Sequence, residues 1–283
     1  MQHAAKLLRH IFISMLIITS TWIFCDESTS PLGKSENTVV LVSEVKWEQL
    51  NPARGDKSPQ AGTLWGDRNG SSATGFLLKP SPGFQSPPHI HNVSYRGVVI
   101  RGLIHNDDPG AEYMWMPQGS FWTQPKGQDH ITAAKGNDTL AYIEIDEAPY
   151  LVLPSKKAFD SGERPVNIDR SNIVWTDTLK NSISKAGVRI AYLWGTPQQG
   201  KLNGTMVKMP SGFSGEIQTS GSNLRAIVIK GKIQYTKNKN NIKTLAPGSY
   251  FSSKGEARHQ IACASECILY IRTYGKFRLQ VKE

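Results

Sequence analysis

Short runs of β-branched and aromatic residues recur along the chain, and residues that favour turns separate them. The runs include residues 74–79 (TGFLLK), 96–102 (RGVVIRG), 112–117 (EYMWMP), 139–145 (TLAYIEI), 225–231 (RAIVIKG) and 267–273 (CILYIRT). Pro-Gly, Asn-Asp, Lys-Gly and Asn-Gly pairs interrupt them at short intervals, and little of the chain has a helical period. This pattern predicts an all-β protein of the sandwich or barrel type.

The β-rich pattern occurs twice, with a constant offset of 129 residues between the copies. Trp65-Gly66 recurs as Trp194-Gly195, and His130 recurs as His259. The same offset relates Gly75 to Gly204, Lys79 to Lys208, Gly83 to Gly212, Gly102 to Gly231, and Gly119-Ser120 to Gly248-Ser249. One register held through so many positions indicates two copies of one domain. We expect the first domain at residues 43–153, a linker at 154–170 and the second domain at 171–283.

The N-terminal segment differs from the rest of the chain. Residues 1–10 carry Lys6 and Arg9 without an acid, and the apolar run at residues 11–24 is too short for a comfortable membrane span. We therefore predict a signal peptide at residues 1–25, a polar linker at 26–42, and an exported protein that is periplasmic or secreted. Cys25 leaves a lipoprotein open as the alternative, so membrane contact is expected only through this segment if it is uncleaved or lipidated.

Two further cysteines, Cys263 and Cys267, flank a predicted turn with the sequence CASEC. Export would allow a disulfide between them. Two buried free thiols are the alternative, and the sequence does not choose between them.

The chain is basic, with a formal net charge of +10 at pH 7. Loss of residues 1–25 removes two bases and no acid, which leaves +8. A cluster of lysines is spaced by Asn, Gln and Thr, and it contains Lys230, Lys232, Lys237, Lys239 and Lys243. Such a cluster is either a surface for an anionic polymer or a solvated hairpin with a lysine-protected edge. Because no aromatic stacking platform is interleaved, we expect the hairpin and no nucleic-acid partner.

Two histidines one residue apart open the candidate site. His89 and His91 follow the Pro87-Pro88 pair, and alternate residues of a strand point to the same face. The glycine- and proline-containing turn at residues 119–127 can bring a second strand alongside and place His130 on the same inner face. Three imidazoles that converge inside a small barrel can bind a first-row divalent metal.

The spacing of these residues resembles the two motifs of the cupin superfamily. The first motif has two glycines, a His-x-His pair and a glutamate, and its positions are occupied here by Gly83, His89, His91, Tyr95 and Gly102. The second motif is matched by Gly119, Pro125, Gly127 and His130. The resemblance covers most of residues 44–150, and it implies two tandem RmlC-like jelly-roll β-barrels with metal ligands at His89, His91 and His130.

The duplicated layout is similar to that of two-cupin proteins in a bacterial family with a domain of unknown function, DUF4437. Related cupins include anti-sigma-factor-type proteins and the three-histidine acetylacetone dioxygenase. The resemblance implies one divalent metal, Fe(II) or Zn(II), with nickel or manganese as alternatives, and it does not define a reaction.

Tyr95 stands where the cupin motif has its glutamate, and its role is open. The phenol either contacts the metal, substrate or a water as a catalytic group, or it packs against the barrel wall. Three neutral imidazoles leave the charge of a divalent metal uncompensated and leave coordination positions open. The site should therefore favour an anionic, preferably bidentate oxygen ligand.

Glu144 is the second candidate catalytic residue. Tyr142 and Glu144 alternate on the predicted strand at residues 139–145, so one parity of that strand should face the barrel interior. If Glu144 faces inward, it can accept a hydrogen bond from an imidazole or act as a base. The alternative is a solvent-facing glutamate.

The second copy lacks the ligand set. The positions of His89, His91 and Tyr95 are occupied by Gln218, Ser220 and Leu224, and only His130 keeps a counterpart, His259. The second domain is therefore expected to keep the barrel without the metal, with His259 as a structural residue.

These observations give two hypotheses for function. The first is an exported metal-dependent enzyme of the dioxygenase or lyase/isomerase type that acts on a small, anionic, oxygen-rich molecule. The second is a non-catalytic metal- or ligand-binding module or sensor, which the missing glutamate and the degenerate second copy favour. A homodimer is left open, because barrels with unpaired edge strands commonly associate.

Overall fold

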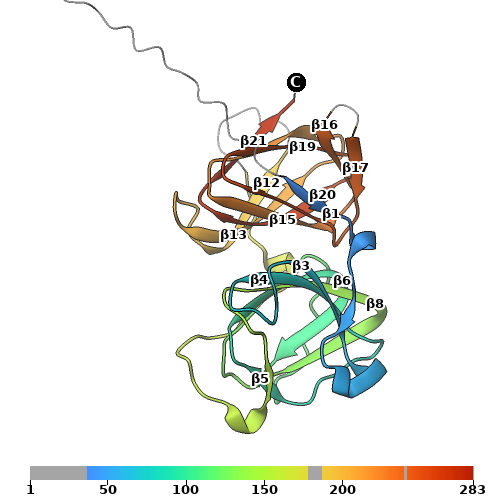
Figure 1. Cartoon of the computed structure of the whole chain (residues 1–283), viewed down its shortest axis with the longest axis vertical. Helices are drawn as coiled ribbons and strands as arrows, with labels where there is room; N and C mark the ends of the chain where they lie inside the picture. The colour runs from blue at the N-terminus through green and yellow to red at the C-terminus, as the bar shows by residue number, and fades with distance from the viewer. Residues whose placement is uncertain (1–36, 178–186, 239–240, 283) are drawn as a thin grey trace, which may run out of the picture. The chain divides into compact units, whose positions relative to one another are not determined.

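The computed structural model describes residues 37–177, 187–238 and 241–282 (Figure 1). The predicted signal peptide, Cys25 and residues 26–36 of the predicted polar linker lie outside the described residues. Within the described ranges, no helix is long and apolar enough to cross a membrane. Strands joined by short turns make up most of the fold, which confirms the predicted all-β class and the jelly-roll architecture.

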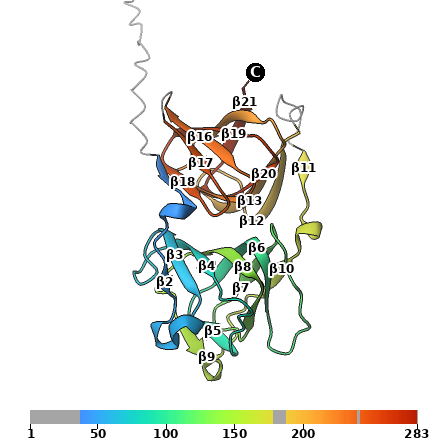
Figure 2. The same ribbon diagram turned by 90° about the vertical axis from the view of Figure 1, so that its right-hand side faces the viewer.

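The first barrel contains a seven-stranded antiparallel sheet in the order β10-β7-β6-β8-β4-β3-β2 and a two-stranded sheet, β5-β9 (Figure 2). Its strands are β2 (Glu48–Gln49), β3 (Gln60–Trp65), β4 (Thr74–Lys79), β5 (His89–His91), β6 (Tyr95–Asp107), β7 (Phe121–Gln124), β8 (Ile131–Ile145), β9 (Val152–Pro154) and β10 (Val166–Ile168). The connections include four short 3-10 helices: η1 (Val42–Glu44), η2 (Pro52–Lys57), η3 (Ser155–Lys157) and η4 (Arg170–Asn172).

The second barrel contains a seven-stranded sheet in the order β1-β18-β15-β20-β13-β12-β11 and a five-stranded sheet, β17-β16-β19-β14-β21. Its strands are β1 (Thr38–Val40), β11 (Thr176–Asp177), β12 (Arg189–Gly195), β13 (Leu202–Met209), β14 (Ser214–Thr219), β15 (Asn223–Lys230), β16 (Ile233–Asn238), β17 (Asn241–Leu245), β18 (Tyr250–Lys254), β19 (Ala257–Cys263), β20 (Cys267–Tyr274) and β21 (Phe277–Val281). The predicted lysine-bearing hairpin is β16-β17, with β17 at a sheet edge.

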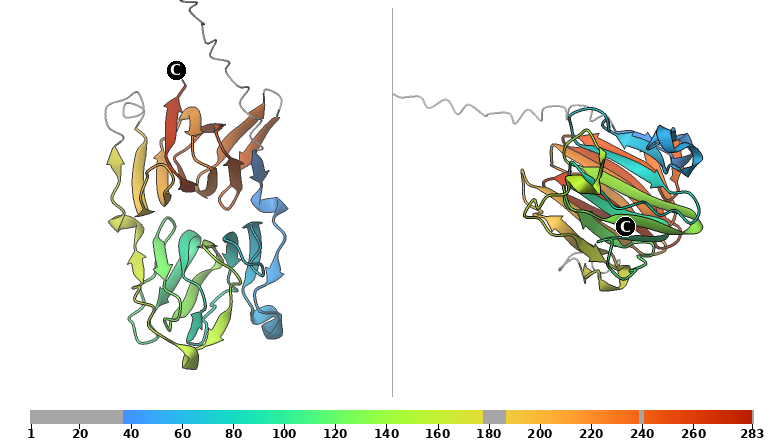
Figure 3. Two further views of the ribbon diagram at one scale, coloured as in Figure 1. Left: turned by 60° about the vertical axis from the view of Figure 1, so that its left-hand side comes forward. Right: turned by 90° about the horizontal axis from the view of Figure 1, so that it is seen from below.

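One edge strand of each barrel's large sheet comes from a segment that connects to the other barrel in the sequence (Figure 3). The N-terminal strand β1 pairs with β18 of the second barrel, whereas β10, which precedes the second barrel in the chain, pairs with β7 of the first. Residues 38–40 and 166–168, which the sequence assigns to linkers, are therefore sheet strands. Pairing satisfies backbone groups of β18 and β7 that would otherwise be exposed at an edge.

The duplicated Trp and Gly residues make the same contact in both barrels. The indole of Trp65 lies over Gly75, and that of Trp194 lies over Gly204, so a Cβ at either glycine would collide with the ring. Close packing of an indole on a bare backbone explains why these two residue types recur together.

The offset between the copies changes by one residue near the end of the repeat. Val98 pairs with Tyr142 in the first barrel, and Ile227, 129 positions later, pairs with Tyr270, which is 128 positions after Tyr142. The second copy therefore has one residue fewer between the position of His130 and that of Tyr142. The expectation of one unbroken offset is wrong for β8 and β20.

The two faces of β8 have different neighbours. Ile143 and Ile145 pack in a core cluster of the first barrel, whereas Tyr142 belongs to a cluster that includes Met206 and Ile227 of the second barrel. Both faces of this strand are thus buried, one around the candidate site and one between the barrels.

The contact between the barrels is pseudo-two-fold. The guanidinium of Arg96 lies 3.8 Å from the ring centroid of Trp194, and that of Arg225 lies 3.9 Å from that of Trp65. Arg96 and Arg225 are 129 residues apart, as are the two tryptophans. The second copy therefore presents the same surface as the first, and the two surfaces contact each other in a reciprocal way.

Candidate metal centre

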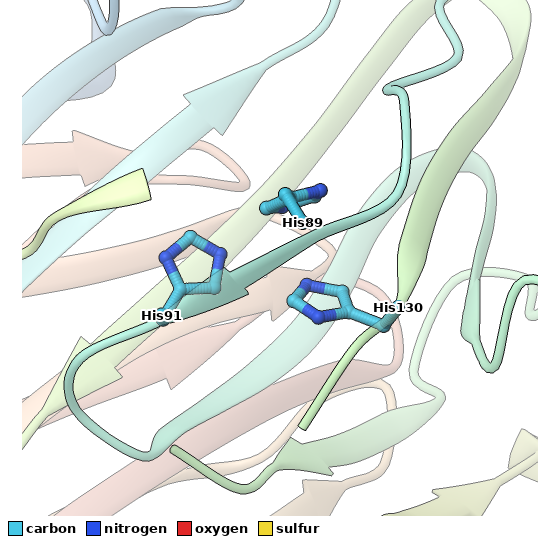
Figure 4. Close-up of side chains that lie close together, drawn as sticks. All are labelled: His89, His91 and His130. Carbon is cyan, nitrogen blue, oxygen red and sulfur yellow. The ribbon is translucent and has the colours of Figure 1, made fainter. Parts of the chain in front are cut away.

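The three predicted ligands meet inside the first barrel. His89 and His91 lie on β5, and His130 immediately precedes β8 (Figure 4). Two backbone hydrogen bonds of 3.0 Å join His89 to His130, and this pairing brings the two segments together. All three side chains are buried, and one ring nitrogen from each lies within 4.8 Å of the others. Small movements of the rings would place each of these nitrogens about 2.1 Å from a shared zinc or iron ion, which is the usual metal–nitrogen distance.

Hydrogen bonds to backbone carbonyls fix the orientation of each imidazole. Nδ1 of His89 donates to the Pro87 carbonyl at 2.9 Å, Nδ1 of His91 to Leu151 at 2.9 Å, and Nδ1 of His130 to Gln128 at 3.2 Å. Each Nδ1 therefore carries a proton, and each Nε2 keeps its lone pair. Metal-binding histidines in proteins are oriented in this way, so the residues present fit a divalent metal.

The electrostatics of the site keep the imidazoles neutral. Burial, and then the charge of the neighbouring His89, lower the pKa of His130 from 6.5 to about 3. Burial and then the charges of His130 and His89 hold the pKa of His91 well below its ordinary value. Burial also lowers the pKa of His89. Neutral imidazoles at neutral pH are ready to accept a metal without losing a proton.

Tyr95 lies beside the histidines, as the motif position predicts. Its hydroxyl donates to Oδ1 of Asn106 at 2.7 Å and lies 3.5 Å from Nε2 of His130. Burial raises the pKa of the Tyr95 phenol, which keeps the group protonated. Asn106 also accepts a hydrogen bond from Thr132 and donates to Gln124, so a buried polar network fixes the phenol. Sequence reasoning missed this network, because neither motif specifies the residue type at position 106 or 124.

Tyr150 is a second phenol at the site, and no sequence motif marks it. Its hydroxyl lies 3.1 Å from Nε2 of His91, and its ring stacks on that imidazole with centroids 4.4 Å apart. Asn92 holds the Tyr150 segment from both sides, because its side chain donates to the Pro149 carbonyl and accepts from the Leu151 amide. The segment folds onto β5 through these side-chain contacts, which no motif or hydrophobic period encodes.

Glu144 does not lie at the site, and its assignment as a catalytic group is wrong. It is fully buried, but its carboxylate accepts hydrogen bonds from Tyr142, Tyr270 and Arg272 at 2.8–3.1 Å, on the face of β8 that contacts the second barrel. Ile143, on the opposite face, lines the cavity beside the histidines. Along residues 140–145 of β8, the odd-numbered side chains therefore face the cavity side and the even-numbered ones face the other barrel.

Two other histidines lie in the described residues, and both are separate from this centre. His105 lies on β6, is fully buried, and stacks on Tyr113 with centroids 4.3 Å apart. In the second barrel, His259 has both ring nitrogens within hydrogen-bond distance of hydroxyls, Tyr235 at 2.8 Å and Ser253 at 3.0 Å. Both nitrogens of His259 are thus occupied by contacts within the second barrel, as expected for a structural residue.

The two cysteines of the second barrel are free and buried. The sequence left a disulfide and two buried free thiols as alternatives, and the structure has the two free thiols. Cys263 ends β19 and Cys267 begins β20, so the predicted turn lies between them.

A cavity of about 320 Å³ lies beside the histidine group, and His89 and His91 line it. Tyr95 and Tyr150 also contribute to its lining, so a small molecule in the cavity would contact part of the histidine group. A volume of this size falls at the lower end of the range for small-molecule pockets, roughly 300–1,000 Å³.

Together, the fold and the histidine group define a cupin-type protein with a candidate metal centre in its first barrel. The model of a family described as "Domain of unknown function (DUF4437)" matches residues 38–280, and the chain belongs to this family. No curated protein sequence matches the chain.

Several solved structures share the fold at low sequence identity. A candidate dioxygenase from Nostoc punctiforme has a TM-score of 0.62 at 12% identity, with 88% of this chain and 87% of that chain covered. Salicylate 1,2-dioxygenase from Pseudoaminobacter salicylatoxidans has a TM-score of 0.55 at 12% identity, with 90% and 87% covered. Oxalate decarboxylase from Lactobacillus farciminis has a TM-score of 0.55 at 11% identity, with 88% and 89% covered. At these identities the likeness shows the fold alone.

Proposed function

We propose that the chain is an exported, metal-dependent cupin enzyme of the dioxygenase or lyase/isomerase type, acting on a small anionic molecule. One observation carries this proposal: three buried histidines beside a cavity each bring a ring nitrogen within 4.8 Å of the others, and each Nδ1 is tied to a backbone carbonyl. Fe(II) suits oxygen chemistry and Zn(II), nickel or manganese suits Lewis-acid chemistry. The solved structures that share the fold include dioxygenases and a decarboxylase, which supports the same range of reactions.

The residues of this chain have separable roles in such a site. His89, His91 and His130 would hold the metal, which when bound would polarise an oxygen of the substrate. Asn106 holds the Tyr95 hydroxyl beside His130, so that the phenol can orient a substrate oxygen or a water. The histidines are neutral and contribute no negative charge, which leaves an anionic ligand attractive to the centre.

Elemental analysis tests this proposal directly. Protein purified without a chelator or a histidine tag should contain about one divalent metal per chain, and His91→Ala should lose it. His105→Ala, which changes a histidine outside the centre, should retain it. If the unaltered protein binds none of Fe(II), Zn(II), nickel and manganese stoichiometrically, even after anaerobic reconstitution, the proposal fails.

A non-catalytic binding module is the second candidate, and the phenol at the motif's glutamate position favours it. Under this alternative the first barrel would bind a metal and an anion without converting the anion. The two candidates separate when aromatic and aliphatic carboxylates are incubated with protein loaded with each of the four metals. Binding without turnover in every combination supports the module.

Export is part of the proposal and rests on residues 1–25. A reporter fused after residue 25 should leave the cytoplasm, and the same fusion without residues 2–25 should remain there. Cytoplasmic retention of both fusions would remove export from the proposal.

A further inference from the structure

The walls of the cavity beside the histidines are apolar. Leu78, Phe84, Trp122, Ile143 and Val152 form much of the lining. Asn51, Ser86 and Thr132 add polar groups, and no acidic residue of the described ranges lines the cavity. A small oxygen-rich acid would leave these walls in contact with water, whereas an apolar body would cover them.

Among the described residues, Arg54 is the single cationic side chain in that lining. It lies on η2, the short helix between β2 and β3, and its guanidinium is 5.8 Å from the ring centroid of Phe84. Among the described residues, no salt bridge involves Arg54, so its charge is not already neutralised by a carboxylate of the chain. Asn51 supports η2 by accepting a hydrogen bond from the Ala53 amide at 3.1 Å.

Arg54 lines the same cavity as His89 and His91. One anionic group in the cavity can therefore pair with Arg54 and approach a metal held by the histidines. A guanidinium is suited to a carboxylate, because its planar donors match the two oxygens.

We propose that the first barrel selects a carboxylate with an apolar, ring-sized body, and that Arg54 pairs with the carboxylate while the apolar walls enclose the body. This inference rests on the proposed function and replaces the oxygen-rich substrate expected from the sequence. The proposed ligand is still a small anion, as the sequence predicts, but most of the ligand's surface is apolar. Arg54 is then a specificity-determining residue, and it lies outside both cupin motifs.

Calorimetric titration of the full chain loaded with Zn(II) tests the proposal without requiring turnover. The probes are benzoate, 3-phenylpropanoate and 2-naphthoate, with oxalate as the polar acid and 2-naphthamide as the neutral counterpart. The best aromatic carboxylate should bind at least about tenfold more tightly than oxalate and 2-naphthamide. Tighter binding of oxalate, or no binding of any aromatic carboxylate, overturns the proposal.

Two variants on η2 separate the role of Arg54 from that of general surface charge. Arg54→Met should weaken binding of the aromatic carboxylate by about 10- to 100-fold and leave 2-naphthamide within about twofold. Lys57→Met removes the same charge from the same short helix at a residue that does not line the cavity, and it should change neither affinity. Equal effects of the two substitutions would assign the binding to long-range charge and overturn the specific role of Arg54.

The same titrations distinguish failure of this inference from failure of the proposed function. If Zn(II) binds and oxalate is preferred, the substrate class is wrong and the metal-dependent function stands. If Zn(II) does not bind but an aromatic carboxylate still binds in an Arg54-dependent way, the substrate class stands and the metal-dependent function fails.

Discussion

The hydroxyl of Tyr150 lies 3.1 Å from Nε2 of His91, the nitrogen that faces the shared metal position. Because Nδ1 of His91 donates to the Leu151 carbonyl, Nε2 is an acceptor and the Tyr150 hydroxyl is its donor. A metal at this nitrogen must displace that hydrogen bond. Tyr150 thus stabilises the metal-free form of the site.

Tyr150→Phe should therefore tighten metal binding. Removal of the hydroxyl abolishes a competing hydrogen bond worth about 1 kcal/mol, which corresponds to a gain in Zn(II) affinity of roughly fivefold. The phenylalanine ring keeps the stacking on His91. Competition with a chromophoric chelator measures the affinity. Weaker binding in the variant would mean that the phenol oxygen is itself a ligand.

Tyr95→Phe should separate a catalytic role from a ligand role. The Tyr95 hydroxyl is held by Asn106 at 2.7 Å and lies 3.5 Å from His130, so its loss removes a group that can contact substrate. We expect turnover of the best aromatic carboxylate to fall by about 100-fold, with the metal content unchanged.

The control for Tyr95 is Tyr113→Phe, which removes a hydroxyl from a partly exposed ring outside the cavity. It should leave turnover unchanged. A fall in the metal content of Tyr95→Phe would show that the phenol ligates the metal. Unchanged turnover in this variant would show that Tyr95 only packs against the barrel wall.

The barrel and its three histidines were predictable because local rules encode them. A strand alternates its side chains, so His89 and His91 must share a face, and the turn at residues 119–127 delivers His130 to the neighbouring segment. The Trp and Gly residues recur with the offset because an indole packs on the bare backbone in each copy. These relationships depend only on the number of residues between positions, which can be read directly from the sequence.

Other parts of the site depend on contacts that spacing does not display. Alternation predicts that Tyr142 and Glu144 share a face, but both faces of β8 are buried, so alternation does not say which face meets the cavity. Tyr150 and Arg54 come from irregular segments that side-chain contacts hold in place. The sequence carries no period or motif that marks either residue.

Acidification should destabilise the metal-free protein through its histidines. His130 has a folded-state pKa of about 3, lowered from 6.5, so below pH 6.5 the unfolded chain binds more protons than the folded one. Stability is therefore retained above about pH 6.5 and lost as the pH falls, by up to about 1.4 kcal/mol per pH unit for this residue.

Urea denaturation of the metal-free protein at pH 7.5 and pH 5.0 measures that loss. His130→Gln cannot titrate, so the difference in unfolding free energy between the two pH values should shrink by about 2 kcal/mol. An unchanged difference in the variant would show that the buried imidazole is already protonated at pH 5.0.

Glu144→Gln should weaken the fold and leave the metal centre intact. Glu144 and Arg272 are equivalent residues of the two copies, 128 positions apart, and their side chains pair at 3.1 Å with almost no exposure. Removal of the carboxylate charge leaves Arg272 with Asp146 as its remaining acidic partner, at 2.7 Å. Because a buried charge loses part of its compensation, we expect a loss of about 2–4 kcal/mol in the free energy of unfolding.

The matched control is Asp138→Asn, which removes a carboxylate from the exposed pair with Arg101 and should cost less than about 1 kcal/mol. Chemical denaturation gives the stabilities, and elemental analysis and carboxylate titration give the state of the centre. The metal content and the carboxylate affinity of Glu144→Gln should equal those of the unaltered protein, because Glu144 lies on the face of β8 opposite Ile143 and the cavity. A stable Glu144→Gln protein without metal would instead mean that the inter-barrel cluster controls the geometry of the histidines.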